Sequence, residues 1–127
     1  MNGTLLVGIG GFVGAIARYR LGAAVLHWSG DARFLAGTFV VNVAGCLVAG
    51  LLAGLAGRYH VLGPDVRLFL FTGLLGGFTT FSAFGMETIG LLRRGEFGVA
   101  GLYAGGSVIL GLAAVWLGLK LFDLIPR

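Results

Sequence analysis

The residues of this chain best suited to binding chemistry are neutral polar side chains placed inside long apolar stretches. Asn42 lies well inside the stretch 34–57, and Thr38 stands one helical turn before it, on the same face. An amide side chain has two N–H donors, which would suit an anion in a pore. Amides also donate across helix contacts in membranes, where neighbouring small residues permit close approach. The sequence leaves both interpretations of Asn42 open.

A denser polar segment lies in the middle of the stretch 67–92, where residues 76–84 read GGFTTFSAF. A continuous membrane helix gains nothing from a Gly-Gly pair and three hydroxyls, so this composition predicts a break. Irregular backbone at this depth must be satisfied by protein or water, and carbonyls freed at the end of a half-helix suit a small cation. We expect the backbone carbonyls of Gly76 and Thr79 to bind Na⁺. The alternative is a continuous helix softened by its glycines.

Aromatic rings recur every three residues around this segment, at Phe78, Phe81 and Phe84. Rings in membrane helices usually face lipid or fill the core. A phenyl ring also has a positive edge, so rings turned edge-on can contact an anion weakly. Weak contacts suit a permeation path, which must release an ion as readily as it binds it. The neutral polar residues and the rings together indicate an anion.

Three further positions have two interpretations each. Tyr103 and Ser107 lie four residues apart on one helix face and either line the same path or hydrogen-bond across a helix contact. Arg18 either gathers anions at a vestibule or snorkels to the membrane interface. Glu87, which closes the third charge-free run, is interpreted as a boundary charge.

The sequence lacks the residue patterns typical of metal sites, enzymes, nucleotide sites and nucleic-acid binding. His27 and His60 have no carboxylate or cysteine at ligand spacing, and Cys46 is the only cysteine. No set of nucleophile, base and orienting residue predicts an enzyme. The glycine-rich segment 8–14 lies inside an apolar stretch and follows no strand, so a nucleotide site is not expected. The basic residues are scattered at segment ends, which argues against nucleic-acid binding.

The elements that must position these residues are membrane helices. Of the 127 residues, 57% are hydrophobic and 11% are charged, against roughly 25% charged residues in soluble domains. A helix needs about 20 apolar residues to cross a bilayer. We therefore predict an all-α integral membrane domain over residues 1–127, with four spans at about 4–27, 34–57, 67–92 and 97–121 and the third helix broken at mid-membrane. The glycine pairs Gly10/Gly14, Gly50/Gly54, Gly73/Gly77 and Gly101/Gly105 fit close helix packing.

The charge distribution does not select one orientation in the membrane. Four spans place both termini on one side, so the basic residues near the span ends can be compared. The terminal side has Arg58, Arg67, Lys120 and Arg127, and the other side has Arg18, Arg20, Arg33, Arg93 and Arg94. Either minor details set the orientation, or the chain inserts both ways. Because four helices are too few to enclose a path and shield it from lipid, we predict an antiparallel, dual-topology homodimer.

Three segments together resemble one family. GGFVGAIARYR in the first span, GTFVVNVAG in the second and GGFTTFSAF in the third resemble the Fluc, or CrcB, family of small bacterial fluoride channels. The resemblance implies an antiparallel dimer with two fluoride pores and a central structural Na⁺, passively exporting fluoride across the bacterial cytoplasmic (inner) membrane. By this resemblance the pore residues are Thr38, Asn42, Thr80, Phe81, Ser82, Phe84, Tyr103 and Ser107, with Arg18 at the vestibule and the carbonyls of Gly76 and Thr79 around Na⁺.

This sequence departs from the family at one position. Ala83 stands where many members have a hydroxyl, so the path here either differs or uses Thr38, Ser82 or Ser107 instead.

Two other functions remain as alternatives. A small multidrug exporter also has four spans, but it needs a titratable carboxylate in the membrane, commonly in the first span, which here has none. The protein could also be a nonconducting assembly subunit. Substitutions at Phe81 or Asn42 would then change its stability or its partners without changing any ion flux.

Overall fold

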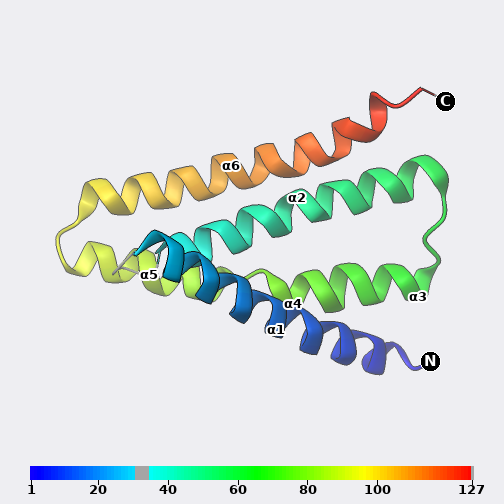
Figure 1. Cartoon of the computed structure of the whole chain (residues 1–127), viewed down its shortest axis with the longest axis horizontal. Helices are drawn as coiled ribbons and strands as arrows, with labels where there is room; N and C mark the ends of the chain where they lie inside the picture. Colours follow the sequence, from blue (N-terminus) through cyan, green and yellow to red (C-terminus); the bar gives the residue numbers. More distant parts are fainter. Residues whose placement is uncertain (31–34, 127) are drawn as a thin grey trace.

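The computed structural model describes residues 1–30 and 35–126 of the chain. Residues 31–33 of the connector between the first two predicted spans, and residue 34, the first of the second span, lie outside the described residues. Over the described ranges the chain is helical: α1 (Gly3–Ser29), α2 (Leu35–Tyr59), α3 (Pro64–Arg67), η1 (Leu68–Leu75), α4 (Gly76–Phe78), α5 (Phe81–Arg93) and α6 (Phe97–Asp123). Four helical segments of the described chain are long and apolar enough to cross a membrane, the third being Pro64–Arg93. Both termini lie at the same end of the molecule (Figure 1).

The helix ends follow from local sequence chemistry. The Asn2 side chain accepts a hydrogen bond from the Thr4 amide at 2.9 Å and caps the start of α1. The third helical segment begins at Pro64, three residues before the expected 67. Proline is tolerated at the first position of a helix because its missing N–H would have no partner there, and Asp65 in the same turn favours the positive end of the helix.

The third segment is broken, as predicted, and within the segment GGFTTFSAF the break lies at the two threonines. Gly76 and Gly77 are still helical in α4, while Thr79 and Thr80 have extended backbone with ψ angles of 156° and 119°. The eight residues of η1 before the glycines form a π-helix, which is rare at this length.

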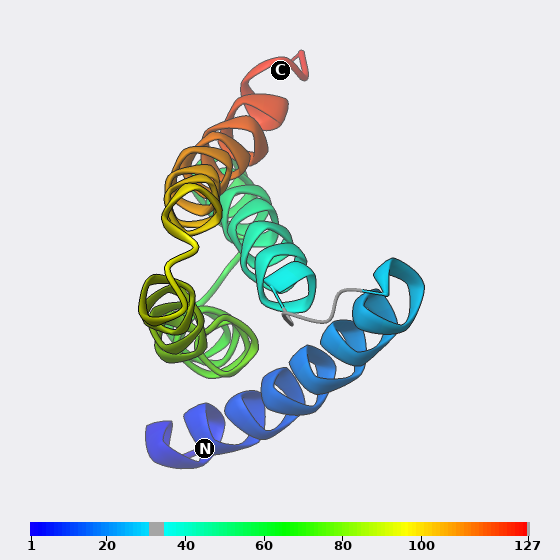
Figure 2. The ribbon, with the colours of Figure 1, turned by 90° about the vertical axis from the view of Figure 1, so that its left-hand side faces the viewer.

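Glycines at the helix crossings set how closely the segments pack. α2 and α6 run side by side, and a Cβ on Gly50 would lie 2.3 Å from the carbonyl oxygen of Val115. α1 crosses the η1–α4 segment (Figure 2), and a Cβ on Gly14 would lie 2.1 Å from the carbonyl oxygen of Leu74. The first three predicted glycine pairs lie at such crossings. Gly101 and Gly105 do not, because a Cβ at either would meet nothing within 4 Å.

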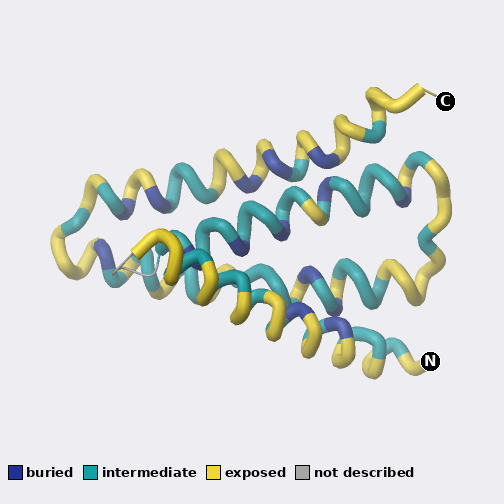
Figure 3. The backbone as a smooth tube through the Cα atoms, in the orientation of Figure 1, coloured by how far each residue is buried: buried dark blue, intermediate teal, exposed yellow. Residues whose placement is uncertain are grey.

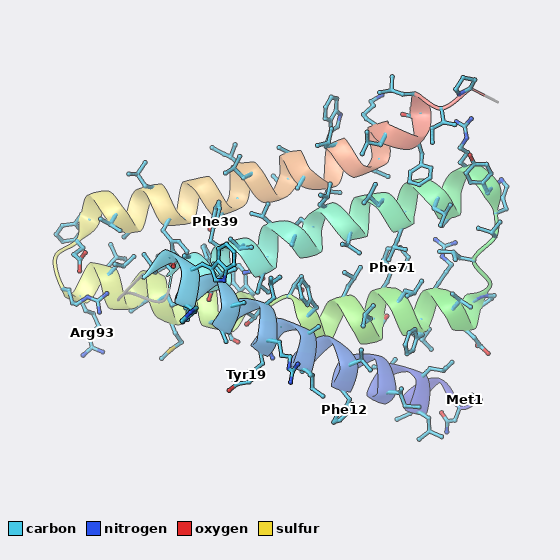
Figure 4. The ribbon with its side chains drawn as sticks, viewed as in Figure 1. Met1, Phe12, Tyr19, Phe39, Phe71 and Arg93 are labelled. Carbon is cyan, nitrogen blue, oxygen red and sulfur yellow. The ribbon has the colours of Figure 1, made fainter. Side chains whose placement is uncertain are left out.

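Little of the chain is buried, and the buried residues face the helix contacts (Figure 3). Leu91, Ala100 and Tyr103 form a small core, with Phe39 and Phe84 packed against it. Elsewhere large apolar side chains are exposed; Phe12 and Tyr19 point away from the bundle, whereas Phe71 points from η1 toward α2 (Figure 4). Such an apolar exterior fits a lipid environment.

Candidate functional site

The break in the third segment is held by Asn42 of α2. The amide of Thr80 donates to Asn42 Oδ1 at 2.8 Å, and Asn42 Nδ2 donates to the carbonyl oxygen of Thr80 at 2.8 Å. One side chain therefore pairs with both backbone polar groups of Thr80. Close approach is possible because a Cβ on Gly45 would lie 2.3 Å from the Thr79 methyl carbon, so only glycine fits there.

Each half-helix is closed at the break by a threonine hydroxyl. The backbone amide and the hydroxyl of Thr79 both donate to the carbonyl oxygen of Leu75, each at 2.9 Å. Thr80 caps the start of α5, since its hydroxyl accepts from the Ala83 amide at 3.2 Å and lies 3.3 Å from the Ser82 hydroxyl. The break is thus a built feature of the fold and not a frayed end.

The geometry also bears on a cation at the break. In a continuous helix the Thr80 amide would donate to the carbonyl of Gly76, but here it donates to Asn42. The Gly76 carbonyl therefore loses its helical donor, and Gly76 is exposed on the surface of the chain. Thr79, three residues further along the chain, has extended backbone. Backbone carbonyls in this state are the hard oxygen ligands that a small monovalent cation prefers.

A cavity of about 260 Å³ opens at the break. It is lined by Asn42, Cys46, Thr79, Thr80, Phe81, Phe84, Ser107 and Val108. The hydroxyl oxygen of Ser107 is buried and has no hydrogen-bond partner among the described residues. A buried polar atom without a partner costs free energy, so this hydroxyl at a cavity wall suits a bound ligand.

The phenylalanine rings form one wall of this cavity. The ring centroids of Phe81 and Phe84 are 5.5 Å apart with planes tilted by 43°, and those of Phe84 and Tyr103 are 5.3 Å apart. Phe81 is 83% exposed in the single chain, so its ring is held on one side only. The Phe81 and Phe84 rings thus pack against each other, and none of the ring contacts among the described residues involves Phe78.

A second tier of polar contacts lies one to two helical turns away from the break. The carboxylate of Glu87 accepts from the Thr38 hydroxyl at 2.7 Å and from the Tyr103 hydroxyl at 2.5 Å. Glu87 therefore joins α2, α5 and α6, which the interpretation as a boundary charge missed. No pattern within one helix pairs these residues, because Thr38 and Tyr103 lie 49 and 16 positions away from Glu87.

Arg18 lies in a different cavity from the rings. That cavity, of about 470 Å³, runs between α1, α2 and α5, and its polar lining is Arg18, Tyr19, Thr38, Thr80 and Glu87. Thr80 lines both cavities. The structure thus brings most of the predicted residues together in two cavities that share Thr80 as a lining residue.

Comparison with known proteins identifies the family. The family model described as CrcB-like protein, Camphor Resistance (CrcB), matches residues 5–119. The chain belongs to the CrcB-like family.

Relatives of the chain match over nearly their full length. The chain is 52% identical over 121 residues to a protein of Methylobacillus flagellatus, covering 95% of this chain and 94% of the relative. It is 44% identical to a protein of Nitratidesulfovibrio vulgaris, covering 94% and 95%, and 51% identical to one of Hyphomonas neptunium, covering 94% of each. All three relatives are named fluoride-specific ion channel FluC. CrcB-like relatives of this kind are channels and not enzymes.

Proposed function

We propose that this CrcB-like protein is a fluoride-selective channel. The observation that carries the proposal is the cavity at the break, which is lined by the buried Ser107 hydroxyl, the Asn42 amide and the Phe81 and Phe84 rings. Fluoride is small and strongly hydrated, so several donors must replace its water. Neutral donors and ring edges supply this without the tight binding of a buried lysine. The names of the relatives supply the identity of the anion.

The two cavities define the path that we propose for the ion. Arg18 gathers anions in the outer cavity, and the hydroxyl of Thr80 in that cavity receives them, while the Thr38 hydroxyl donates to Glu87. Ala83 lines the same outer cavity and not the cavity of the rings. The hydroxyl that Ala83 replaces would therefore belong to this outer cavity, where the Thr80 hydroxyl compensates for it. Beyond Thr80 the ion passes the rings with Asn42 and Ser107, while Ser82 and Tyr103 flank this stretch.

The channel is proposed to be an antiparallel homodimer with a structural Na⁺ at its centre. In the single chain Gly76 and Phe81 are exposed at the break, so the ion path has no wall on that side. An inverted second copy seated there would close the path. It would also bring a second Gly76 carbonyl and a second Thr79 carbonyl to the first pair, giving Na⁺ an oxygen cage. The ion would supply a fixed positive charge that holds the two broken helices together.

The direction of transport follows from the chemistry of fluoride. Hydrofluoric acid enters an acidified cell as a neutral molecule and dissociates inside, so a passive path lets fluoride leave down its gradient. We place this multi-pass protein in the bacterial cytoplasmic membrane, where it lowers fluoride toxicity. Coupling to ATP or to a proton gradient is not needed.

A Phe81→Ile variant tests the role of the rings. Isoleucine keeps the bulk of an apolar side chain and removes the ring edge, so we expect at least a tenfold lower rate of fluoride efflux from liposomes. Phe12→Ile is the matched control, because Phe12 is similarly exposed but points away from the bundle on α1 (Figure 4). Normal efflux through a correctly assembled Phe81→Ile dimer would remove the rings from the mechanism.

A further inference from the structure

A cavity with no part in the proposed ion path lies between the ends of α2 and α6. Its volume is about 940 Å³, and it shares no residue with the cavities at the break. The lining includes Gly57, Arg58, His60, Trp116, Lys120 and Asp123. The ends of both helices lie at the end of the molecule where the two chain termini are found (Figure 1).

The aromatic residues around this cavity place it at the level of lipid headgroups. Tyr59 at the end of α2 is 46% exposed, and Trp116 on α6 is 61% exposed. Tyrosine and tryptophan are enriched at the membrane–water interface, where one end of the side chain is apolar and the other is hydrated. The space beside Gly57 is open, since a Cβ there would meet nothing within 4 Å.

The charge of the cavity favours an anion. Arg58 and Lys120 contribute two positive charges and Asp123 one negative charge, which leaves a net charge of +1 with His60 neutral. Lys120 and Asp123 form an ion pair at 3.3 Å, but their side chains are 49% and 67% exposed. Such an exposed pair is weak, so the Lys120 ammonium remains available to a second anion.

Arg58 offsets the repulsion between a bound anion and the carbonyl groups at the end of α6. The carbonyls at a helix C-terminus repel anions, and α6 ends beside the cavity. Arg58 Nη1 donates to the carbonyl oxygen of Phe122 at 2.6 Å, and Nη2 donates to that of Ile125. These bonds neutralise the end of α6 and use two of the five donors of the guanidinium.

We propose that this cavity binds the phosphate headgroup of an anionic phospholipid. Lys120 and Arg58 face the phosphodiester, and the apolar surface of Trp116 and Leu119 receives the first part of the acyl chains. A basic pocket between membrane helices at headgroup depth is a recognised setting for acidic lipids. A zwitterionic lipid is expected to bind less tightly, because its own positive group offsets the attraction between its phosphate and the basic residues of the cavity.

The sequence offers an internal probe, since Lys120 is the only lysine. We would acetylate the full-length protein in mixed micelles containing phosphatidylglycerol or phosphatidylcholine and measure the modification of Lys120 by mass spectrometry. The N-terminal amine, at the same end of the molecule, corrects for the effect of lipid charge on amine reactivity. We expect phosphatidylglycerol to protect Lys120 and phosphatidylcholine not to protect it. Equal modification in the two lipids would overturn the proposal, and so would equal protection by soluble glycerol phosphate, which would show a general phosphate site.

Charge variants give a second readout by native mass spectrometry of bound lipid. Lys120→Gln is expected to weaken phosphatidylglycerol binding about fivefold, whereas Asp123→Asn, which removes the negative charge, is expected to strengthen it. Arg67→Gln is the matched control, because Arg67 is a basic residue at the same end of the molecule that does not line the cavity. Loss of lipid binding in Arg67→Gln equal to that in Lys120→Gln would reduce the effect to general surface charge and contradict the proposal. The readout is lipid binding, so it does not depend on fluoride transport.

Discussion

At the scale of single residues, Asn42 makes the packing contacts of one of the two roles between which the sequence could not decide, and its pore role stays a prediction. Its carbonyl oxygen and one N–H bind the backbone of Thr80, which is the packing role. Asn42 also lines the cavity at the break, and the amide has a second N–H donor beyond the one given to Thr80. The side chain can therefore hold the irregular backbone and face the ion path at once.

Ser107 allows transport to be separated from folding. Its hydroxyl is buried without a partner among the described residues, so Ser107→Ala should leave the stability of the fold unchanged or slightly raise it. If the hydroxyl donates to fluoride, the same change should lower the fluoride efflux rate about ten- to a hundredfold, because hydrogen bonds to charged groups contribute roughly 1.5–3 kcal/mol. Thermal unfolding in detergent and efflux from liposomes measure the two effects.

Ser29→Ala is the control for Ser107→Ala, because Ser29 is an exposed serine at the end of α1. Unchanged efflux in Ser107→Ala would place the ion path elsewhere.

The contacts of Glu87 could not be predicted from the sequence. Its partners Thr38 and Tyr103 lie 49 and 16 residues away on other helices, and no pattern within one helix pairs them with Glu87.

At the scale of elements, the fold depends on how closely α1 approaches the η1–α4 segment. The helices themselves could be predicted from charge-free stretches, and the break from the segment GGFTTFSAF. The π-helical turn of η1 and the exact place of the break could not, because both depend on contacts between elements: α1 against η1, and Asn42 of α2 against Thr80.

The close contact between α1 and the η1–α4 segment can be tested with two glycines of α1. A Cβ at Gly14 would lie 2.1 Å from the carbonyl oxygen of Leu74, so Gly14→Ala must force the backbones apart. We expect it to destabilise the fold by about 1–3 kcal/mol, as overpacked sites do. Gly8→Ala, where nothing lies within 4 Å, should be neutral or stabilise the helix by up to about 1 kcal/mol. Denaturation in detergent micelles measures both; equal effects would show that α1 does not cross η1 as described.

At the scale of the whole molecule, the single chain leaves the region of the break exposed, and the proposed channel needs a second copy there. Phe81 is 83% exposed and Met86 78% exposed on α5, and the cavity at the break is open on that side. We expect an inverted copy to cover it. Because both termini lie at one end of the chain, a C-terminal tag reports the orientation of each molecule (Figure 1).

Tag accessibility in intact cells tests this dual topology. The nearly even distribution of basic residues predicts that the chain inserts both ways, so about half of the tags should be labelled from outside and the rest only after permeabilisation. Labelling from one side only would exclude an antiparallel dimer formed from a single gene product.

The central claim is selective, passive fluoride conduction, and it is tested most directly by efflux from liposomes. Purified protein would be reconstituted with equal internal fluoride and chloride, a K⁺ ionophore would be added, and both anions would be followed with selective electrodes. We predict rapid loss of fluoride with chloride retained, without ATP or a proton gradient. No fluoride flux, together with substrate exchange that requires a proton gradient, would contradict the account and favour a proton-coupled exporter that uses Glu87.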